Sequence, residues 1–149
     1  MPLVTFRCDH IYGPPDQPGP TASAFLAKSG KVLLLGSGSQ RLAPLYREDV
    51  VEAIAHAALD PETPIGTFQF ASPDDMSAEE FARVLNPAPI RVRRVPAMLA
   101  RLLAPVAPNL TPELVDVMLA DAVPTEDVVA TARRFGVELH HLADVWRSR

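Results

Sequence analysis

The sequence predicts a mixed α/β fold, in which an open parallel sheet of a few strands is followed by a helical C-terminal cap. An apolar, strand-like run over residues 3–6 leads directly into a polar loop that ends at Gly13 and Pro14. Strands end in this way at the ligand-facing edge of an open α/β sheet. Strand and helix patterns then alternate as far as residue 95, and helix patterns follow to the end of the chain.

Length and composition predict a single domain over residues 1–149. Of the 149 residues, 48% are hydrophobic, which is enough for one core. The formal net charge of -4 leaves no basic stripe of the kind that a general nucleic-acid surface needs, so we expect no nucleic-acid partner. The single cysteine, Cys8, excludes an internal disulfide and is typical of a reducing compartment.

Two further segments bear on where the protein resides. Residues 1–3 lack the basic and apolar regions of a secretory signal. The longest apolar-leaning segment, residues 96–110, contains Arg101 and is shorter than the ~20 residues of a membrane span. We therefore expect a cytoplasmic protein without a transmembrane segment.

Local patterns predict the elements of the first half. Several prolines keep the loop after the first strand irregular, and Pro44 keeps its neighbours out of a central ladder. Glu48 and Asp49 favour a helix N-terminus, and Val50 and Ile54 lie on the expected buried face of that helix. The expected order is a helix over residues 21–28, a strand over 31–35, a turn over 36–39, an extended passage over 41–46, a helix over 48–59 and a strand over 67–71.

The second half is predicted to be mostly helical. Ser77 followed by Glu80 is a capping-box pattern, which predicts a helix to about residue 85. A short strand over residues 90–95 precedes the tail, which begins at about residue 96. Pro112 and Gly136 are typical of a helix start and a helix end. The tail helices are expected over residues 97–103, 111–119, 125–135 and 139–146.

Five motifs follow one another along nearly the whole chain. They are residues 7–14, Gly36-x-Gly38-x-x-Arg41-x-x-Pro44-Leu45-Tyr46-x-x-Asp49-Val50, Gly66-Thr67-Phe68-Gln69-Phe70, Ser77-x-Glu79-Glu80, and a tail that includes Leu110-Thr111-Pro112-Glu113. Together they resemble the C-terminal half of extended and atypical short-chain dehydrogenase/reductases. Within that group, the sequence looks most like the NAD-dependent epimerase/dehydratase-like proteins that include the accessory subunit of respiratory complex I. The resemblance implies part of a Rossmann-type sheet, and NAD(P) as the cofactor of a full-length relative.

The resemblance also points to two features that this sequence lacks. The family holds its dinucleotide on a Gly-rich turn between a strand and a helix, but the turn at residues 36–39 has no third glycine and leads into an extended passage. The family's reductase step uses a Tyr four residues before a Lys, but alanines occupy the positions four residues before Lys28 and Lys31. We therefore expect no catalytic residue and no bound cofactor in the isolated chain.

The candidate ligand-binding residues are Arg7, Asp9, His10 and Tyr12, where the first strand meets its loop. The alternative for Arg7 is a buried partner of carboxylates, and for the others ordinary loop polarity. Cys8 is expected to be a small buried side chain rather than a nucleophile. Sugar-nucleotide enzymes of the extended type tend to have an Asn in place of His10 and an Arg in place of Leu42, so the resemblance is closer to the atypical branch. The ligand itself stays open.

In the family, Arg41, Tyr46 and Asp49 correspond to a structural clasp. The resemblance implies that Asp49 caps the following helix and that Tyr46 packs beneath it, with the cap contributing about 1 kcal/mol.

No metal site is expected, because Cys8, His10, His140 and His141 do not form the two compact pairs of a zinc site. Of the two adjacent histidines, one is expected to be packed and the other exposed.

Three functions remain open. The first is the substrate-side region of an NAD(P)-dependent epimerase or reductase, inactive in isolation and completed by a chain that supplies the N-terminal Rossmann half. The second is a non-catalytic module that forms a homodimer or completes a partner chain, since we expect the opening strand to lack a parallel neighbour. The third is a small enzyme that uses the loop with Asp9, His10 and Tyr12.

Overall fold

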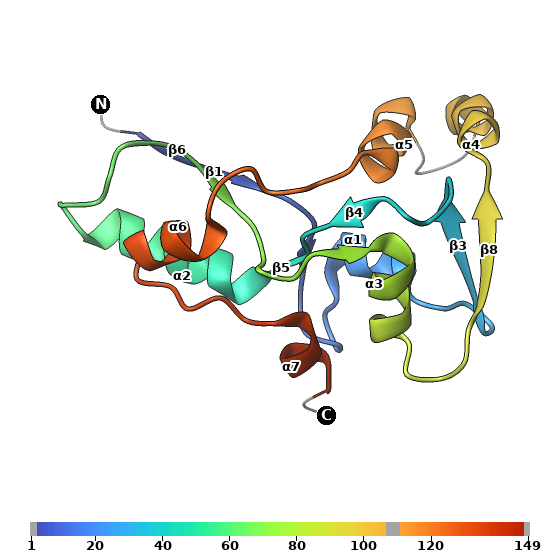
Figure 1. Cartoon of the computed structure of the whole chain (residues 1–149), viewed down its shortest axis with the longest axis horizontal. Helices are drawn as coiled ribbons and strands as arrows, with labels where there is room; N and C mark the ends of the chain where they lie inside the picture. The colour runs from blue at the N-terminus through green and yellow to red at the C-terminus, as the bar shows by residue number, and fades with distance from the viewer. Residues whose placement is uncertain (1–2, 107–110, 148–149) are drawn as a thin grey trace. The chain divides into compact units, whose positions relative to one another are not determined.

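The computed structural model of the chain describes residues 3–106 and 111–147. The chain divides into two compact units. Unit 1 comprises Met1–Ala24, Ala43–Asp75 and Val123–Arg149, and unit 2 comprises Phe25–Leu42 and Met76–Ala122. Neither unit is one continuous segment, and the predicted helical tail contributes to both. Figure 1 shows the helices and strands of both units.

Unit 1 is built on two short parallel strand pairs. Strand β1 (Val4–Cys8) pairs in parallel with β6 (Gly66–Phe70), with Val4 opposite Gly66 and Cys8 opposite Phe70. Strand β2 (Ile11–Tyr12) pairs in parallel with β5 (Leu45–Tyr46). The expectation that the opening strand lacks a parallel neighbour is therefore wrong, because residues more than fifty positions later supply one.

One face of the β1–β6 pair forms the core of unit 1. Phe6 packs with Phe70 and with Phe135, at ring-centroid distances of 5.3 and 4.7 Å, and Phe68 packs with Phe135 at 5.0 Å. Phe135 ends helix α6 (Val128–Arg134). Such aromatic contacts stabilise the core beyond what the buried area of the rings contributes.

The helices of unit 1 are α1 (Gly19–Phe25, whose last residue belongs to unit 2), α2 (Arg47–Leu59), α6 and α7 (Leu142–Arg147). Helix α2 turns Ala53 into the core, together with Asp49. Val50 is half-buried, but Ile54 is 53% exposed, so its predicted place on the buried face is wrong. The apolar spacing of Val50 and Ile54 predicted a buried face that includes Ile54. The helix instead buries the carboxylate of Asp49, which no apolar pattern indicates.

Unit 2 is built on a third parallel pair. Strand β3 (Lys31–Leu35) pairs with β8 (Arg91–Val95), and β4 (Arg41–Leu42) pairs antiparallel with β7 (Met76–Ser77). Buried Val32 and Leu34 lie on one face of β3. Helix α3 (Ala78–Leu85) contributes Phe81, whose ring lies 5.1 Å from that of Phe25.

Two short helices follow β8 in unit 2. Helix α4 (Ala97–Leu103) continues into a 3₁₀ turn (Ala104–Val106), and α5 (Pro112–Leu119) has Thr111 as its N-cap. The two helices bury only small or medium side chains, those of Ala100, Ala104 and Val115. These side chains pack against Leu35 and Val95, at the ends of β3 and β8. These helices therefore cover only the end of the face that carries Leu33 and Leu35, and Leu33 stays 63% exposed.

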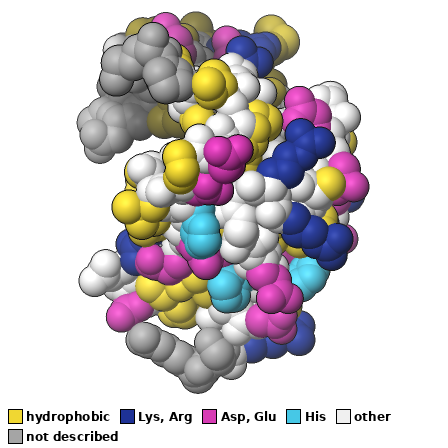
Figure 2. Space-filling model, turned by 90° about the vertical axis from the view of Figure 1, so that its left-hand side faces the viewer, with side chains coloured by type: hydrophobic (Ala, Val, Ile, Leu, Met, Phe, Trp, Pro, Cys, Tyr) yellow, Lys and Arg dark blue, Asp and Glu magenta, His cyan; other side chains and the backbone are white. Residues whose placement is uncertain are grey.

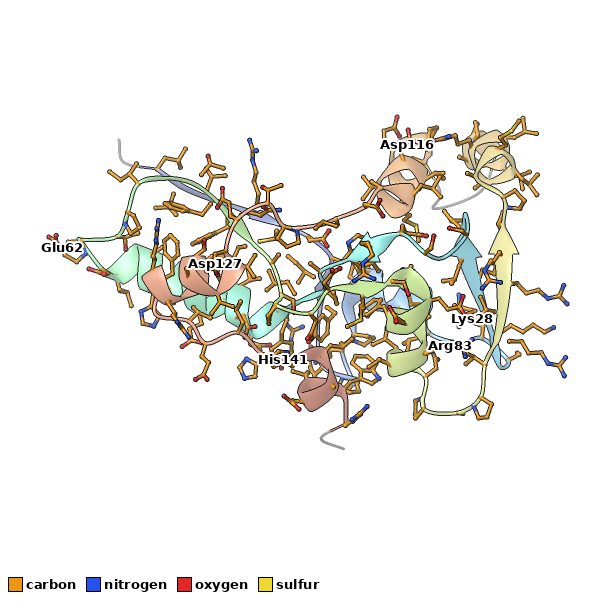
Figure 3. All side chains as sticks on the ribbon, in the orientation of Figure 1. Lys28, Glu62, Arg83, Asp116, Asp127 and His141 are labelled. Atoms are coloured by element: carbon orange, nitrogen blue, oxygen red, sulfur yellow. The ribbon has the colours of Figure 1, made fainter. Side chains whose placement is uncertain are left out.

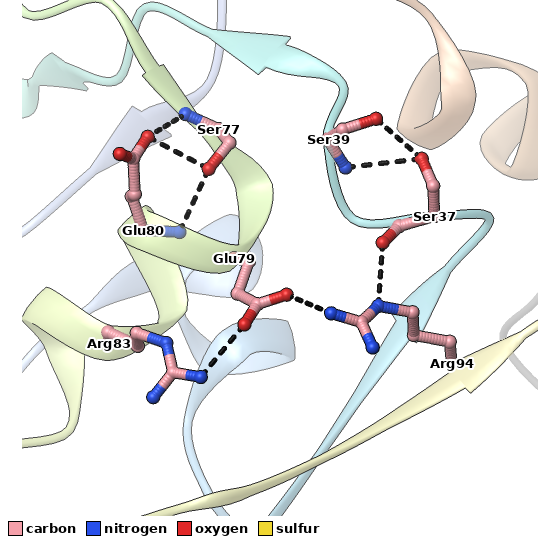
Figure 4. A network of polar contacts seen from close by, with 7 residues as sticks. All are labelled: Ser37, Ser39, Ser77, Glu79, Glu80, Arg83 and Arg94. Atoms are coloured by element: carbon pink, nitrogen blue, oxygen red, sulfur yellow. Dashed lines mark hydrogen bonds and ion pairs between the residues drawn. The ribbon is translucent and has the colours of Figure 1, made fainter.

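A polar network fixes the Gly-Ser turn after β3 (Figure 4). Arg94 donates to the carbonyl oxygen of Ser37 at 2.7 Å and pairs with Glu79 of α3. Glu79 also pairs with Arg83 at 2.8 Å. These two arginines hold the pKa of Glu79 below its ordinary value, Arg83 being the larger cause. The turn is therefore bound to α3 and β8 by side-chain contacts.

Candidate functional site

Arg7 lies on the open face of the β1–β6 pair, opposite the aromatic core. Its side chain is exposed, so it is not a buried partner of carboxylates. It borders a polar cavity of about 330 Å³ that is also lined by Thr67, Gln69, Thr125 and Glu126. The side-chain oxygen of Gln69 accepts hydrogen bonds from the backbone N–H and the hydroxyl of Thr125, at 2.9 and 3.1 Å. The cavity thus offers one guanidinium, one carboxylate and neutral polar groups to a ligand.

Asp9 and His10 form a pair in the short connection between β1 and β2. The imidazole Nδ1 of His10 lies 2.6 Å from a carboxylate oxygen of Asp9, and only 9% of the His10 side chain is exposed. The other Asp9 oxygen accepts a hydrogen bond from the backbone N–H of Ala43 at 3.0 Å. Asp9 therefore orients an imidazole and also ties Ala43, two residues before β5, to the segment that follows β1.

Tyr12 is fully buried, so its side chain does not face the solvent as a loop residue would. Its ring packs against Tyr46 and Trp146, at 5.6 and 6.5 Å. Burial, followed by the nearby charges of Asp74 and Asp49, raises the pKa of the Tyr12 phenol well above its ordinary value. At physiological pH the phenol is neutral and cannot act as a base.

Tyr46 and Asp49 lie at the start of α2 and act differently from the predicted clasp. The N-cap residue is Tyr46, no side chain caps the helix there, and Asp49 does not have the capping role. The buried Asp49 carboxylate instead accepts hydrogen bonds from His140, at 2.9 Å from its backbone N–H and 2.5 Å from its imidazole. The rings of Tyr46 and His140 lie 5.4 Å apart. The clasp therefore joins α2 to the C-terminal segment of unit 1.

Arg41 lies in unit 2, in strand β4. Its backbone N–H donates to Asp121 at 2.7 Å, and its carbonyl accepts from the N–H of Ala122 at 2.8 Å. Its backbone contacts thus hold the segment after α5 against β4.

A third histidine–aspartate pair is formed by His141, the residue directly after His140. His141 lies 2.7 Å from Asp74, whose other oxygen accepts from the N–H of Leu142 at 2.7 Å. The hydrogen bond from Asp74 raises the pKa of His141, and the charges of Asp74 and Asp144 add to the effect. Figure 3 labels His141 beside the start of α7.

His141 also borders an open groove of about 500 Å³ in unit 1. Its lining includes Arg133, Glu138 and the apolar Val129. An imidazole oriented by a carboxylate can exchange protons with a bound molecule.

The sequence did not predict the pairs that His140 and His141 form with Asp49 and Asp74. His140 and His141 were expected to be one packed and one exposed, yet both side chains are more than half exposed, and each binds its own aspartate. The partner aspartates lie 91 and 67 residues away in the sequence, so no local spacing predicts these contacts.

The described residues give three further results. Over residues 3–106 and 111–147, no three His, Cys, Asp or Glu side chains gather closely enough to hold a metal ion. Burial, and then the charge of Asp9, raises the pKa of the Cys8 thiol, which disfavours the thiolate. None of the helices in the described ranges combines the length and the apolar character needed to cross a bilayer.

No protein-family model and no curated protein matches the sequence. Solved structures do resemble the fold. UDP-glucuronic acid 4-epimerase from Bacillus cereus, in complex with UDP-glucuronic acid and NAD, aligns with 97% of this chain and 43% of its own, at 14% identity and a TM-score of 0.61. TunA, an NAD-dependent NDP-hexosamine 5,6-dehydratase involved in tunicamycin biosynthesis, aligns with 95% of this chain and 42% of its own, at 22% identity and a TM-score of 0.58. WbmG from Bordetella bronchiseptica, in complex with NAD and UDP, aligns with 95% of this chain and 39% of its own, at 19% identity and a TM-score of 0.53.

The chain has the fold of part of an NAD-dependent epimerase or dehydratase. This confirms, at the level of the fold, the resemblance that the five motifs indicated. It also confirms the predicted mixed α/β class, with short parallel strand pairs and several helices. The chain spans 39–43% of the length of these three enzymes.

Proposed function

We propose that the chain is the substrate-side, C-terminal region of an NAD(P)-dependent epimerase- or reductase-like protein, and that it is not catalytic in isolation. The carrying observation is that 95–97% of the chain aligns with only 39–43% of each of the three enzymes. The sequence contains neither the Gly-rich cofactor turn nor the Tyr/Lys pair of the family. A separate polypeptide segment supplies both in this proposal.

The polar cavity beside Arg7 is the place proposed for a small-molecule ligand. Arg7 is exposed there, and its guanidinium can form paired hydrogen bonds with a carboxylate or a phosphate. Asp9 and His10 follow Arg7 closely in sequence, just after β1. Asp9 is held there by its contacts with His10 and with the backbone N–H of Ala43.

Calorimetry of the isolated chain with NADH and NADPH tests the cofactor part of the proposal. No saturable binding in the micromolar range is expected, and micromolar binding of either nucleotide would overturn it. The genomic DNA upstream of the coding sequence tests the other part. An in-frame or adjacent strand–turn–helix segment with a Gly-rich turn is expected there, and its absence would remove the proposed partner segment.

A second candidate function is that of a non-catalytic assembly module, which forms a homodimer or completes a partner chain. The observation that favours it is the pairing of β1 with β6 alone, and of β3 with β8 alone, among the described residues. Two-stranded parallel pairs leave outer edges and faces that can receive another chain. A strictly monomeric sedimentation profile at high protein concentration would remove this candidate.

A further inference from the structure

One face of the β3–β8 pair carries three exposed cations, Lys31, Arg91 and Arg93. Lys31 lies opposite Arg91, and Leu33 lies opposite Arg93. All four side chains are exposed, Leu33 to 63%. No ion pair joins the three cations to any residue of the described ranges, whereas Arg94, on the same strand, pairs with Glu79. Like charges opposite each other destabilise a strand pair, so this basic sheet face favours an anionic partner.

Helix α2 of unit 1 presents a complementary surface. Glu48, Val51, Glu52, Ala55 and Leu59 have the i, i+3, i+4, i+7, i+11 spacing of one helix face, and all are exposed, Val51 to 54% and Leu59 to 83%. They lie on the side of α2 opposite buried Ala53. This acidic helix face combines two carboxylates with an apolar stripe. Figure 2 shows acidic, basic and apolar side chains mixed on one face of the molecule.

The carboxylates of the acidic helix face remain available. Glu48 pairs with its neighbour Arg47 at 2.8 Å, and Glu52 lies 3.9 Å from His56, yet 49% of each glutamate side chain is exposed. Exposed pairs of this kind contribute little and exchange easily for a better partner.

We propose that the acidic helix face of one copy of this chain docks on the basic sheet face of a second copy. The spacings of the two surfaces match. Glu48 and Glu52 lie four residues apart, about 6 Å along a helix, and Arg91 and Arg93 lie two residues apart, about 6.6 Å along a strand. Each carboxylate can therefore meet one guanidinium while the apolar stripe covers Leu33.

A second copy is the occupant because both complementary faces belong to this chain. Unit 1 carries thirteen acidic and six basic side chains, whereas unit 2 carries five acidic and eight basic ones. Unit 1 of one copy therefore attracts unit 2 of another. Two such contacts related by a two-fold axis form a closed dimer. The inference rests on the second candidate function above and gives it defined surfaces.

Charge reversal tests the contact with the full chain. Light scattering after size exclusion is expected to show a dimer for the wild type and a monomer for both Arg91→Glu/Arg93→Glu and Glu48→Lys/Glu52→Lys. An equimolar mixture of the two variants is expected to form a heterodimer, because each reversed face then meets a face of opposite charge. The matched control, Arg133→Glu/Arg134→Glu, reverses two exposed arginines of α6 and is expected to stay dimeric.

Each other outcome counts against the proposal. A monomeric wild type overturns it together with the assembly function. A dimer that both reversals leave intact overturns these surfaces but leaves the assembly function standing. A monomer that sediments with phosphatidylserine vesicles, and loses this binding in Arg91→Glu/Arg93→Glu, assigns the basic sheet face to a membrane instead. Circular dichroism checks that each variant is folded, and failure of the folded variants to form the mixed heterodimer also overturns the contact.

Discussion

The carboxylate of Asp49 accepts two hydrogen bonds from His140, at 2.9 Å from the backbone N–H and 2.5 Å from imidazole Nδ1. Asp49 is completely buried in α2, and 53% of the His140 side chain is exposed. The histidine thus covers the carboxylate on its solvent side. A buried carboxylate is tolerated when it accepts hydrogen bonds. Removing it costs free energy, because its donors are then left without an acceptor.

The first prediction is that Asp49→Ala destabilises the protein by about 1–3 kcal/mol, because it leaves the partly buried N–H of His140 without an acceptor. Urea unfolding followed by circular dichroism measures the change. The control is Glu62→Gln, since Glu62 is exposed, and a change within about 0.5 kcal/mol is expected for it. Equal unfolding midpoints for Asp49→Ala and the wild type would show that the pair with His140 does not stabilise the fold.

The second prediction concerns the pH dependence of the His141–Asp74 pair. Asp74 raises the pKa of His141 above the ordinary value of 6.5. Because the folded pKa exceeds the unfolded one, the stabilisation is fully present below about pH 6.5 and is lost as the pH rises through the folded pKa. The stability advantage of the wild type over His141→Gln is therefore expected to shrink on the alkaline side.

Urea unfolding of both proteins from pH 5.5 to pH 9 measures this difference. The His141 side chain is 57% exposed, so solvent screening keeps the expected advantage below about 1 kcal/mol. An NMR titration of the imidazole gives the folded pKa directly. A difference in stability that stays constant with pH, or a titration at or below the ordinary value, contradicts the prediction.

Local signals predicted much of the fold. The strand over residues 31–35 and the helix over residues 97–103 have the expected bounds, and the Ser77–Glu80 capping box forms at the start of α3. Each depends on apolar runs, caps or turn residues that are close together in the sequence. Helix α6 is shorter than expected, because Asp127 rather than Thr125 provides its N-cap.

Long-range pairing could not be predicted in the same way. Strands β2 and β5 have two residues each, too few for any alternation to be visible. The resemblance led to Asp49, but its partner His140 was found only in the structure. The predicted residues Arg7, Asp9 and His10 end or follow one strand, yet Tyr12 turns inward, because the next short strand buries it against Tyr46 and Trp146. A loop-like sequence does not tell which of its side chains the second strand pair will bury.

The third prediction concerns the start of α3. The hydroxyl of Ser77 accepts from the N–H of Glu80 at 3.2 Å, and the Glu80 carboxylate accepts from the N–H of Ser77 at 2.7 Å (Figure 4). Ser77→Ala removes the first of these bonds and is expected to cost about 1 kcal/mol in urea unfolding. Ser39→Ala serves as the control, because the Ser39 hydroxyl lies at an exposed turn and, among the described residues, bonds the hydroxyl of Ser37 alone. If the two variants unfold at the same urea concentration, the box adds no stability.

The fourth prediction separates backbone strain from crowding at two glycines of unit 2. Gly30 and Gly38 both have a positive φ, 72° and 80°, so alanine is strained at either position. A Cβ at Gly30 meets nothing within 4 Å, whereas one at Gly38 would lie 2.8 Å from a methyl carbon of Leu34, which is buried and cannot move aside freely. Gly30→Ala is therefore expected to cost about 1 kcal/mol, and Gly38→Ala a further ~1–3 kcal/mol for the crowding. Thermal and urea unfolding of both variants give the comparison directly. A Gly38→Ala variant no less stable than Gly30→Ala would mean that Leu34 moves aside for the added Cβ without cost.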